Sequence, residues 1–530
     1  MNHLIHDSLF DMASVRPGAL ALAYGATRCT YAELAALVRA VSSMVLAQGL
    51  EPGARVAVYM EKRIENVAAM FGTAAAGCVF VPVNPLLKPA QVAYILADCN
   101  VKLLVTTAER VEQLGPVLAD CPDLRSLLLV GEPAPAHAPT VPWFAWAQVE
   151  SHAGEARAEL APHRRIDGDM AAILYTSGST GSPKGVVLSH RNLVAGAASV
   201  ADYLGMRSDD RLLAVLPLSF DYGLSQLTTA FRTGAAVVLM NYLFPKDIVT
   251  MVASERITGL AAVPPLWNAL ARLEWPADCS LRFITNSGGA MAPVTVDALR
   301  ACLPQAEIFL MYGLTEAFRS TFLPPAEVAR RPDSIGRAIP NAEVLVVRPD
   351  GSLCEPGEPG ELVHRGALVA LGYWNDPQRT AQRFRPAPGQ PPGLPLPEMA
   401  VWSGDTVRRD EEGFLYFIGR HDEMIKVSGY RISPTEIESV VQATGLVNEA
   451  AAFGIDDVQL GQSIALVATL PDGAATDAGE VIAACRQRLP AYMVPAHVVL
   501  RQGSLPRNPN GKIDRSLLRH TLQSTLTVRS

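Results

Sequence analysis

The sequence predicts an α/β protein with a large N-terminal domain of mostly parallel sheets covered by helices and a small C-terminal α+β domain. Over the first 420 or so of the 530 residues, short β-rich apolar runs alternate with segments of helical period. Loops rich in Gly, Ser, Thr and Pro follow the apolar runs. Strands that alternate with helices form mostly parallel sheets with helices on both faces.

Five apolar runs are expected to be strands of the large domain, and each ends in a loop of unusual composition. They are residues 171–175, 211–216, 259–263, 281–285 and 307–311. Amphipathic helices are expected at residues 248–257 and 294–303. In open α/β sheets, ligands bind beyond the carboxyl ends of the strands. We therefore expect these loops to converge on one crevice.

The pattern changes after residue 420, so we expect domains 1–421 and 422–530, joined near Asp422. The expected elements of the second domain are a helix at 436–443, a strand at 463–470 and a helix at 479–489. A Pro- and Gly-rich stretch at residues 386–397 is expected to be an irregular surface loop.

The composition excludes several classes of protein. With 49% hydrophobic residues, a net charge of −7 and no long basic run, the chain is not expected to bind nucleic acid. Its 8 cysteines are scattered without a Cys-x-x-Cys pair, and no signal peptide precedes them, so we expect a cytoplasmic protein without a disulfide framework or zinc. The apolar stretch 67–83 contains Gly77 and Pro82, which favours a helix and a buried strand over a transmembrane segment.

The strongest local signal is the loop at residues 175–185. Its three glycines can turn backbone N–H groups inward, its three serines and two threonines add hydroxyl donors, and Lys184 adds charge, which together suit a polyphosphate. The alternative is a flexible turn between a strand and a helix. The loop is not a Walker motif, because Gly185 follows the lysine where a P-loop NTPase or kinase has Ser or Thr.

This loop and four other segments, in the same order, resemble the adenylate-forming ligase superfamily of acyl-CoA synthetases, adenylation domains and luciferases. The other segments are Tyr-Gly-Leu-Thr-Glu at 312–316, Trp-Ser-Gly-Asp at 402–405, the junction at 419–432 and the lysine loop at 506–513. The resemblance implies an ATP- and Mg²⁺-dependent acid–thiol ligase. A carboxylate attacks the α-phosphorus, pyrophosphate leaves, and the acyl group passes to the thiol of CoA or of a carrier-protein phosphopantetheine.

Two alternatives remain beside this function. One is an amino-acid adenylation enzyme that loads only a separate carrier protein. The other is a non-catalytic nucleotide-binding module, for which loss of Lys512, Glu316 or Asp405 would be the expected sign, and all three are present. A serine hydrolase lacks support because the chain has no Gly-x-Ser-x-Gly elbow.

The resemblance assigns catalysis to Lys512, Glu316 and Lys184, and Mg²⁺ to Thr176 and Glu316. Without the resemblance, a solvated loop carboxylate would be the favoured interpretation of Glu316. The implied ATP/AMP-binding residues are Thr176, Ser177, Gly178, Ser179, Thr180, Gly181, Lys184, Gly288, Tyr312, Gly313, Thr315, Asp405, Arg420 and Lys512. Among them, Tyr312 offers a face for adenine or is a core tyrosine, and Asp405 binds the ribose or forms an Asx turn after Gly404.

The remaining assignments concern the second half-reaction and the acid. The resemblance makes Asp422 the hinge and places Lys426 and Gly429 where the pantetheine arm enters. The expected substrate-pocket residues are Asp221, Tyr222, Ser225, Trp267, Met311 and Arg319.

The sequence alone does not decide the roles of two charged residues of this expected pocket. Asp221 either pairs with a substrate ammonium or caps a helix that begins at Tyr222, and Arg319 either faces a second carboxylate or points to solvent. We expect a small polar acid or an amino acid.

Overall fold

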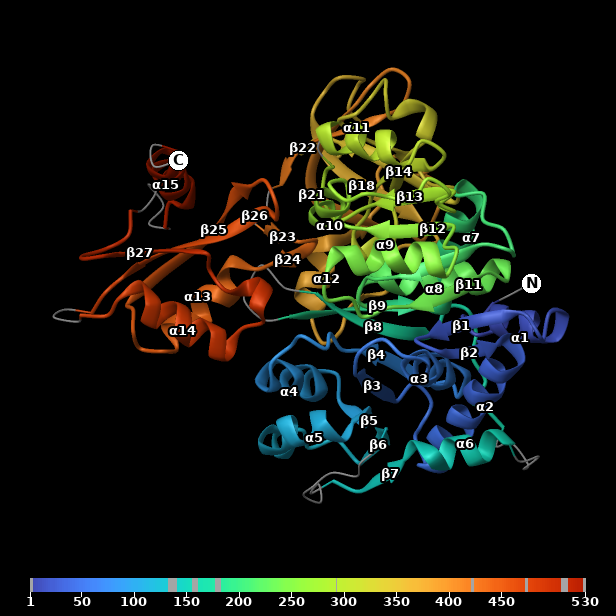
Figure 1. Cartoon of the computed structure of the whole chain (residues 1–530). Coiled ribbons are helices and arrows are strands. Elements are labelled where there is room, and N and C mark those ends of the chain that lie inside the picture. Colours follow the sequence, from blue (N-terminus) through green and yellow to red (C-terminus); the bar gives the residue numbers. More distant parts are fainter. Residues whose placement is uncertain are drawn as a thin grey trace.

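The structure is a computed structural model of the chain, and it describes residues 3–131, 141–154, 161–176, 183–291, 293–420, 424–471, 475–506 and 513–527. The described residues form three sheets with helices packed on them, which confirms the predicted α/β class. Figure 1 shows the elements from β23 (Ile425–Val427) onward, in orange and red, to one side of the rest of the chain. Asp422 lies outside the described residues, so the exact domain boundary stays a prediction.

The eight-stranded sheet has the order β19-β9-β8-β4-β3-β5-β6-β7. Its strands are β3 (Arg55–Tyr59), β4 (Val79–Pro82), β5 (Val101–Thr107), β6 (Ser126–Val130), β7 (Trp143–Ala145), β8 (Met170–Thr176), β9 (Lys184–Ser189) and β19 (Gly372–Tyr373). From β8 to β7 the pairs are parallel, whereas β9 is antiparallel to both neighbours. Neighbouring residues of β3 face opposite sides. Val56 joins the core with α2 (Tyr31–Ala47) and α3 (Ile64–Ala75), and Ala57 joins the core with α4 (Pro89–Asp98) and α5 (Ala108–Leu114).

The fourteen-stranded sheet is parallel at its centre and antiparallel at both ends, where β2 forms one end and the strands from β15 onward form the other. The parallel strands, in spatial order, are β14 (Glu307–Tyr312), β13 (Phe283–Asn286), β12 (Gly259–Ala262), β10 (Arg211–Ala214), β11 (Ala236–Leu239) and β1 (Leu20–Tyr24). The antiparallel strands are β2 (Thr27–Thr30), β15 (Thr321–Leu323), β16 (Ser334–Ala338), β17 (Ala342–Val347), β18 (Gly360–Gly366), β20 (Phe384–Pro386), β21 (Met399–Arg409) and β22 (Leu415–Arg420). The five expected strands are therefore all present, divided between two sheets. The antiparallel hairpins after β14 were not predicted.

The other helices of the large domain are short to medium in length. They are α1 (Asp7–Val15), α6 (Trp146–Gly154), α7 (His190–Tyr203), α8 (Asp221–Thr233), α9 (Pro245–Ser254), α10 (Pro264–Leu270), α11 (Pro293–Cys302) and α12 (Pro377–Arg383). The helix expected at 248–257 begins three residues earlier, because Pro245 occupies its first turn, where a fixed φ and a missing N–H are tolerated.

The small domain is a five-stranded sheet with helices on both faces. Its elements are β23, β24 (Tyr430–Ile432), α13 (Pro434–Gln442), β25 (Glu449–Asp457), β26 (Gly461–Thr469), α14 (Ala478–Arg488), β27 (His497–Arg501) and α15 (Arg515–Thr527). One core lies under α13 and α14, and a second lies under α15. The three elements expected here are confirmed with shifts of one or two residues.

The apolar stretch at 67–83 divides into α3 and β4, as expected. Within the described ranges, no helix is both long enough and apolar enough to cross a membrane.

Candidate active site

The Gly-rich loop joins two antiparallel strands rather than a strand and a helix. Thr176 at the end of β8 lies opposite Lys184 at the start of β9, and the next helix, α7, begins only at His190. The alternative of a strand-to-helix turn is therefore wrong, and no helix N-terminus follows this loop directly. Five expected nucleotide-binding residues, Ser177, Gly178, Ser179, Thr180 and Gly181, lie outside the described residues.

Lys184 and Glu316 form a buried ion pair completed by Tyr373, and we call these three residues the Lys184 cluster. The Lys184 Nζ lies 2.9 Å from Glu316 Oε1 and 2.8 Å from Tyr373 Oη. The Tyr373 hydroxyl donates to the same carboxylate oxygen at 2.6 Å, and Nζ also lies 4.3 Å from the centre of the tyrosine ring. Burial and the charge of Glu316 raise the pKa of Tyr373, so its hydroxyl keeps the proton that it donates. Glu316 is only 1% exposed, so it is not a solvated loop carboxylate.

Tyr312 and Asp405 link the loop that carries Glu316 to the antiparallel end of the large sheet. The Tyr312 hydroxyl donates to Asp405 Oδ2, and Asp405 lies inside β21 with 5% exposure. The Asx-turn alternative for Asp405 is therefore wrong. Its cross-strand partner in β22 is Arg420, whose side chain lies outside the described residues. Lys184 and Glu316 thus contact each other, and Asp405 contacts Tyr312 of the same short segment that carries Glu316.

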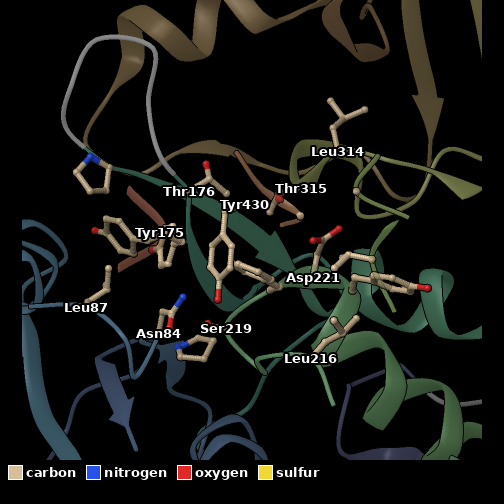
Figure 2. Close-up of a pocket in the computed structure, with 18 of the residues that line it drawn as sticks. Asn84, Leu87, Tyr175, Thr176, Leu216, Ser219, Asp221, Leu314, Thr315 and Tyr430 are labelled. Carbon is tan, nitrogen blue, oxygen red and sulfur yellow. The ribbon is translucent and has the colours of Figure 1, made fainter. Parts of the chain in front are cut away.

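These loops surround one main cavity, which also receives residues of the small domain. Thr176, Gly288, Gly313 and Thr315 line it, as expected. Figure 2 shows Thr176, Asp221 and Thr315 of the large domain around the Tyr430 ring of the small domain. Lys512 lies outside the described residues.

Gly429 and Glu436 make two of the contacts between the small domain and the cavity. The tight turn between β23 and β24 holds Ser428 at φ +50° and Gly429 at φ +84°, the paired positive values of a two-residue hairpin turn. A Cβ on Gly429 would lie 2.5 Å from Val263 Cγ1 of the large domain, so only glycine fits here without a shift. Lys426 instead lies with Nζ 4.9 Å from the centre of the Phe417 ring in β22, and it is not among the residues lining the main cavity.

Glu436 makes the second contact, because Gln91 Nε2 of α4 donates to its Oε1 at 3.2 Å. Burial raises the pKa of Glu436 to about 7, and the Gln91 hydrogen bond opposes the shift only in part.

Asp221 and Arg319 form a second buried ion pair at the cavity wall. Arg319 Nη1 lies 3.0 Å from Asp221 Oδ2, with the two side chains 2% and 18% exposed, respectively. Two alternatives are therefore wrong: Arg319 does not point to solvent, and Asp221 is the first residue of α8, with Phe220 at the N-cap. Burial raises the pKa of Asp221, and the nearby guanidinium opposes that effect.

Behind this pair lies an inner cavity that reaches toward α7. Four of the predicted substrate-pocket residues, Tyr222, Ser225, Met311 and Arg319, line this cavity, and their role in binding the acid stays a prediction. Trp267 does not line either cavity. It is 0% exposed, and its ring N–H donates to the backbone oxygens of Ala262 and Thr285, so it is a core residue.

The oxygen donors at the main cavity fit a Mg²⁺ shared with phosphate. Thr176 Oγ1 is buried and has no hydrogen-bond partner among the described residues, and it lies on the strand opposite Lys184, whose Nζ contacts Glu316. The described residues contain no group of three or more His, Cys, Asp or Glu side chains that could hold a metal alone. Two protein oxygens leave further positions for phosphate oxygens and water, as is usual for Mg²⁺.

Residues that the sequence analysis missed include Tyr373, Tyr430 and Glu436. Each stands at a contact between segments far apart in the chain, and none belongs to a spacing pattern that would have identified it. Tyr373 follows Gly372 in a two-residue strand paired with β9, which places it beside Lys184.

Comparisons with known proteins show the family of the chain. Residues 9–374 match the family model described as AMP-binding enzyme, and residues 436–512 match the model for the AMP-binding enzyme C-terminal domain. The L-proline--[L-prolyl-carrier protein] ligase of Streptomyces coelicolor is 34% identical over 92% of this chain and 91% of its own length. Tyrocidine synthase 3 of Brevibacillus parabrevis is 30% identical over 100% of this chain, which spans only 8% of that protein. A double mutant of o-succinylbenzoate CoA synthetase from Bacillus subtilis, bound with its product analogue, superimposes with a TM-score of 0.82 at 26% identity, covering 96% of this chain and 97% of that one.

Proposed function

Since the chain belongs to the AMP-binding enzyme family, we propose that it activates a small amino acid with ATP and passes the aminoacyl group to a pantetheine thiol. The observation that carries the proposal is the convergence of three groups on residues 312–316. Thr176 lines the main cavity with Gly313 and Thr315, Glu316 belongs to the Lys184 cluster, and Tyr312 contacts Asp405. The acceptor is CoA or the phosphopantetheine of a separate carrier protein. The similarity to a prolyl-carrier ligase and the aspartate at the cavity wall favour the second acceptor and an amino acid.

The first half-reaction makes the acyl-adenylate. A carboxylate oxygen of the acid bonds to the α-phosphorus, the bond from that phosphorus to the bridging oxygen breaks, and pyrophosphate leaves. Thr176, residues 177–181 and Lys184 bind the phosphates, and Lys512 binds the reacting oxygens. Asp405 and Arg420 bind the ribose, and Tyr312 lies against the adenine. Positioning of the reactants and neutralisation of charge accelerate the reaction, so no covalent nucleophile on the protein is needed.

Glu316 and Thr176 would hold a Mg²⁺ together with phosphate oxygens. When bound, this ion neutralises part of the triphosphate charge. Glu316 would then exchange its contact with Lys184 for the ion, which releases the Lys184 ammonium toward the phosphates.

In the second half-reaction, the pantetheine sulfur attacks the acyl carbon, AMP leaves with the bonding electrons, and the thiol proton passes to solvent. The small domain turns at Asp422 between the two steps, and Gly429 leaves room for the pantetheine arm beside Val263. The cytoplasmic location drawn from the scattered cysteines is part of this proposal.

Pyrophosphate exchange with purified full chain tests the function. We expect ATP to yield AMP and pyrophosphate in the presence of an amino acid, and Lys184→Ala to lower the exchange rate by about 100-fold, as removal of one preorganised charged donor does. Lys102→Ala is the matched control, because Lys102 also pairs with a carboxylate, Asp123, but lies away from the cavity. ADP and phosphate as products, or equal rates for both variants, would contradict the proposal.

A further inference from the structure

Arg319 is buried with part of its hydrogen-bonding capacity unused. Its side chain is 2% exposed, and Nη1 donates to Asp221 Oδ2 and to the Phe318 carbonyl oxygen, each at 3.0 Å. Among the described residues, neither Nε nor Nη2 has an acceptor. A buried guanidinium is stable only when its N–H groups are satisfied, so these two atoms need an acceptor beyond the described residues, which a bound ligand can supply.

The two unused nitrogens lie on the same edge of the guanidinium plane. In arginine, Nε–H and one Nη2–H are parallel, and this edge accepts the two oxygens of a carboxylate through paired hydrogen bonds. The Arg319 Cζ lies 4.7 Å from the centre of the Tyr222 ring, which restricts the orientation of the guanidinium plane. A planar acceptor with two oxygens therefore fits the unused edge.

The backbone that presents Arg319 is strained. Phe318 has φ +54° and ψ −46°. The Arg319 N–H donates to the Ala317 carbonyl oxygen at 2.5 Å, which closes a γ-turn of the rare positive-φ form. Gly196 of α7 makes room for the Phe318 ring, because a Cβ there would lie 2.6 Å from Phe318 Cδ1. Strain of this kind persists only where the surroundings impose it, and it concentrates at ligand sites.

A second buried polar atom lies in the same place. Thr229 Oγ1 has no partner among the described residues, and Thr229 lines the inner cavity together with Arg319. Thr229 stands seven residues after Tyr222 on α8, so the two side chains share one face of the helix. A hydroxyl and an unused guanidinium edge that line the same cavity both suit an acceptor group.

The charge balance of Asp221, Arg319 and the bound substrate indicates which class of molecule supplies the acceptor group. Asp221 and Arg319 neutralise each other, and Asp221 keeps 18% exposure and lines the main cavity. A second carboxylate alone would leave one negative charge in excess, and an ammonium alone would leave one positive charge. A substrate that brings both keeps the buried group of charges neutral.

We propose that the acid is a small amino acid with a second carboxylate. Its ammonium binds Asp221, its second carboxylate binds the Nε and Nη2 edge of Arg319 with Thr229 beside it, and its other carboxylate reacts with ATP. This inference rests on the proposed function and names the substrate class of the same site.

Pyrophosphate exchange across matched acids tests the inference. The panel contains aspartate and glutamate, their amides asparagine and glutamine, the des-amino acids succinate and glutarate, and neutral amino, fatty and aryl acids. We expect an amino diacid to exceed its amide and its des-amino analogue in kcat/KM by about 100-fold each, since each analogue leaves the buried group of charges with one charge in excess.

Variants assign the preference to Arg319. Arg319→Met should lower kcat/KM for the amino diacid by about 100-fold and leave its amide within a few-fold. Arg282→Met is the matched control, because Arg282 pairs with the buried Asp210 at 2.6 Å outside both cavities, and it should keep the wild-type preference. Arg319→Lys, which keeps the charge without the fork, should be intermediate, and melting temperatures show whether each variant folds.

The outcomes distinguish a wrong substrate class from a wrong ligase function. Exchange with neutral amino acids at least as fast as with amino diacids, or an unchanged preference in folded Arg319→Met or Arg319→Lys, overturns the substrate class and leaves the ligase function standing. No exchange with any acid of the panel overturns both.

Discussion

At the scale of single residues, the Lys184 cluster joins three groups with different tasks. Lys184 Nζ, Glu316 Oε1 and Tyr373 Oη lie within 2.9 Å of one another in a site where Glu316 is 1% exposed. An ion pair buried to this degree is held by its hydrogen bonds, and loss of one donor weakens the rest. Tyr373 therefore fixes the carboxylate that the proposed function gives to Mg²⁺.

Substitution of Tyr373 by phenylalanine separates the hydroxyl from the ring. The ring would stay against Lys184, while Glu316 would lose the hydrogen bond of 2.6 Å. We expect kcat of adenylation to fall about ten- to a hundredfold, the value of one hydrogen bond to a charged group. The Mg²⁺ concentration for half-maximal rate should rise with it. Pyrophosphate exchange at a series of Mg²⁺ concentrations measures both.

The matched control for Tyr373→Phe is Tyr416→Phe. Tyr416 also bridges a carboxylate and a cation, since its hydroxyl donates to Asp410 at 3.0 Å and accepts from Arg331 at 3.2 Å, but this trio is separate from the Lys184 cluster. Equal losses in the two variants would show that the hydroxyl of Tyr373 supports the fold alone.

At the scale of elements, the sequence predicted the strands and loops better than their pairing. Short apolar runs identified β8, β10, β12, β13 and β14 within a few residues, because buried parallel strands have nearly continuous apolar sequences. The antiparallel pairing of β8 with β9 was missed, because residues 184–189 have the apolar character of either a strand or the first turn of a helix.

The same limit applies to the site. Residues within one motif, such as Thr315 and Glu316, were found from the family pattern. The pairing of Asp221 with Arg319 was not, because the two positions stand 98 residues apart and meet only after β14 and α8 pack. Trp267 was placed in the pocket because a large aromatic after a strand suits a wall as well as a core, and only the packing decides between them.

The hairpin of β23 and β24 allows a test at the same scale. Gly429→Ala adds a Cβ 2.5 Å from Val263 Cγ1 at a residue with φ +84°. Overpacking of this kind costs about 1–3 kcal/mol, so we expect thioester formation from a synthetic acyl-adenylate to slow about tenfold or more. Adenylation, measured by pyrophosphate exchange, should change much less.

Gly445→Ala is the control for Gly429→Ala. Gly445 has a similar φ of +71°, yet nothing lies within 4 Å of its added Cβ, so it isolates the strain of the backbone from the clash. If both half-reactions slow equally in Gly429→Ala, or if Gly445→Ala matches it, close approach to Val263 has no part in thiolation.

At the scale of the whole molecule, the two domains meet through a carboxylate whose charge depends on pH. Glu436 of α13 is 8% exposed against α4, and its pKa rises from 4.5 to about 7 in this arrangement. When the domains separate, water returns to the carboxyl group and the pKa falls toward its ordinary value. The docked arrangement therefore binds a proton that the separated one releases.

Because the docked arrangement binds a proton at Glu436, docking of the two domains should weaken as the pH rises. Below about pH 4.5 the group is protonated in both arrangements, and docking carries no penalty from Glu436. As the pH rises from 4.5 to about 7 the docked arrangement weakens, and above that range the loss is complete and constant.

Glu436→Gln keeps the size of the side chain and its contact with Gln91 but cannot ionise. We therefore expect the ratio of the variant's thioester-forming rate to the wild-type rate to rise between pH 5 and 7 and to level off near pH 8. Because a ratio cancels the ionisation of the attacking thiol, which is common to both proteins, a flat ratio across this range would show that Glu436 does not control how the two domains dock. Glu411→Gln, at an exposed position of the large domain, should give a flat ratio in the same experiment.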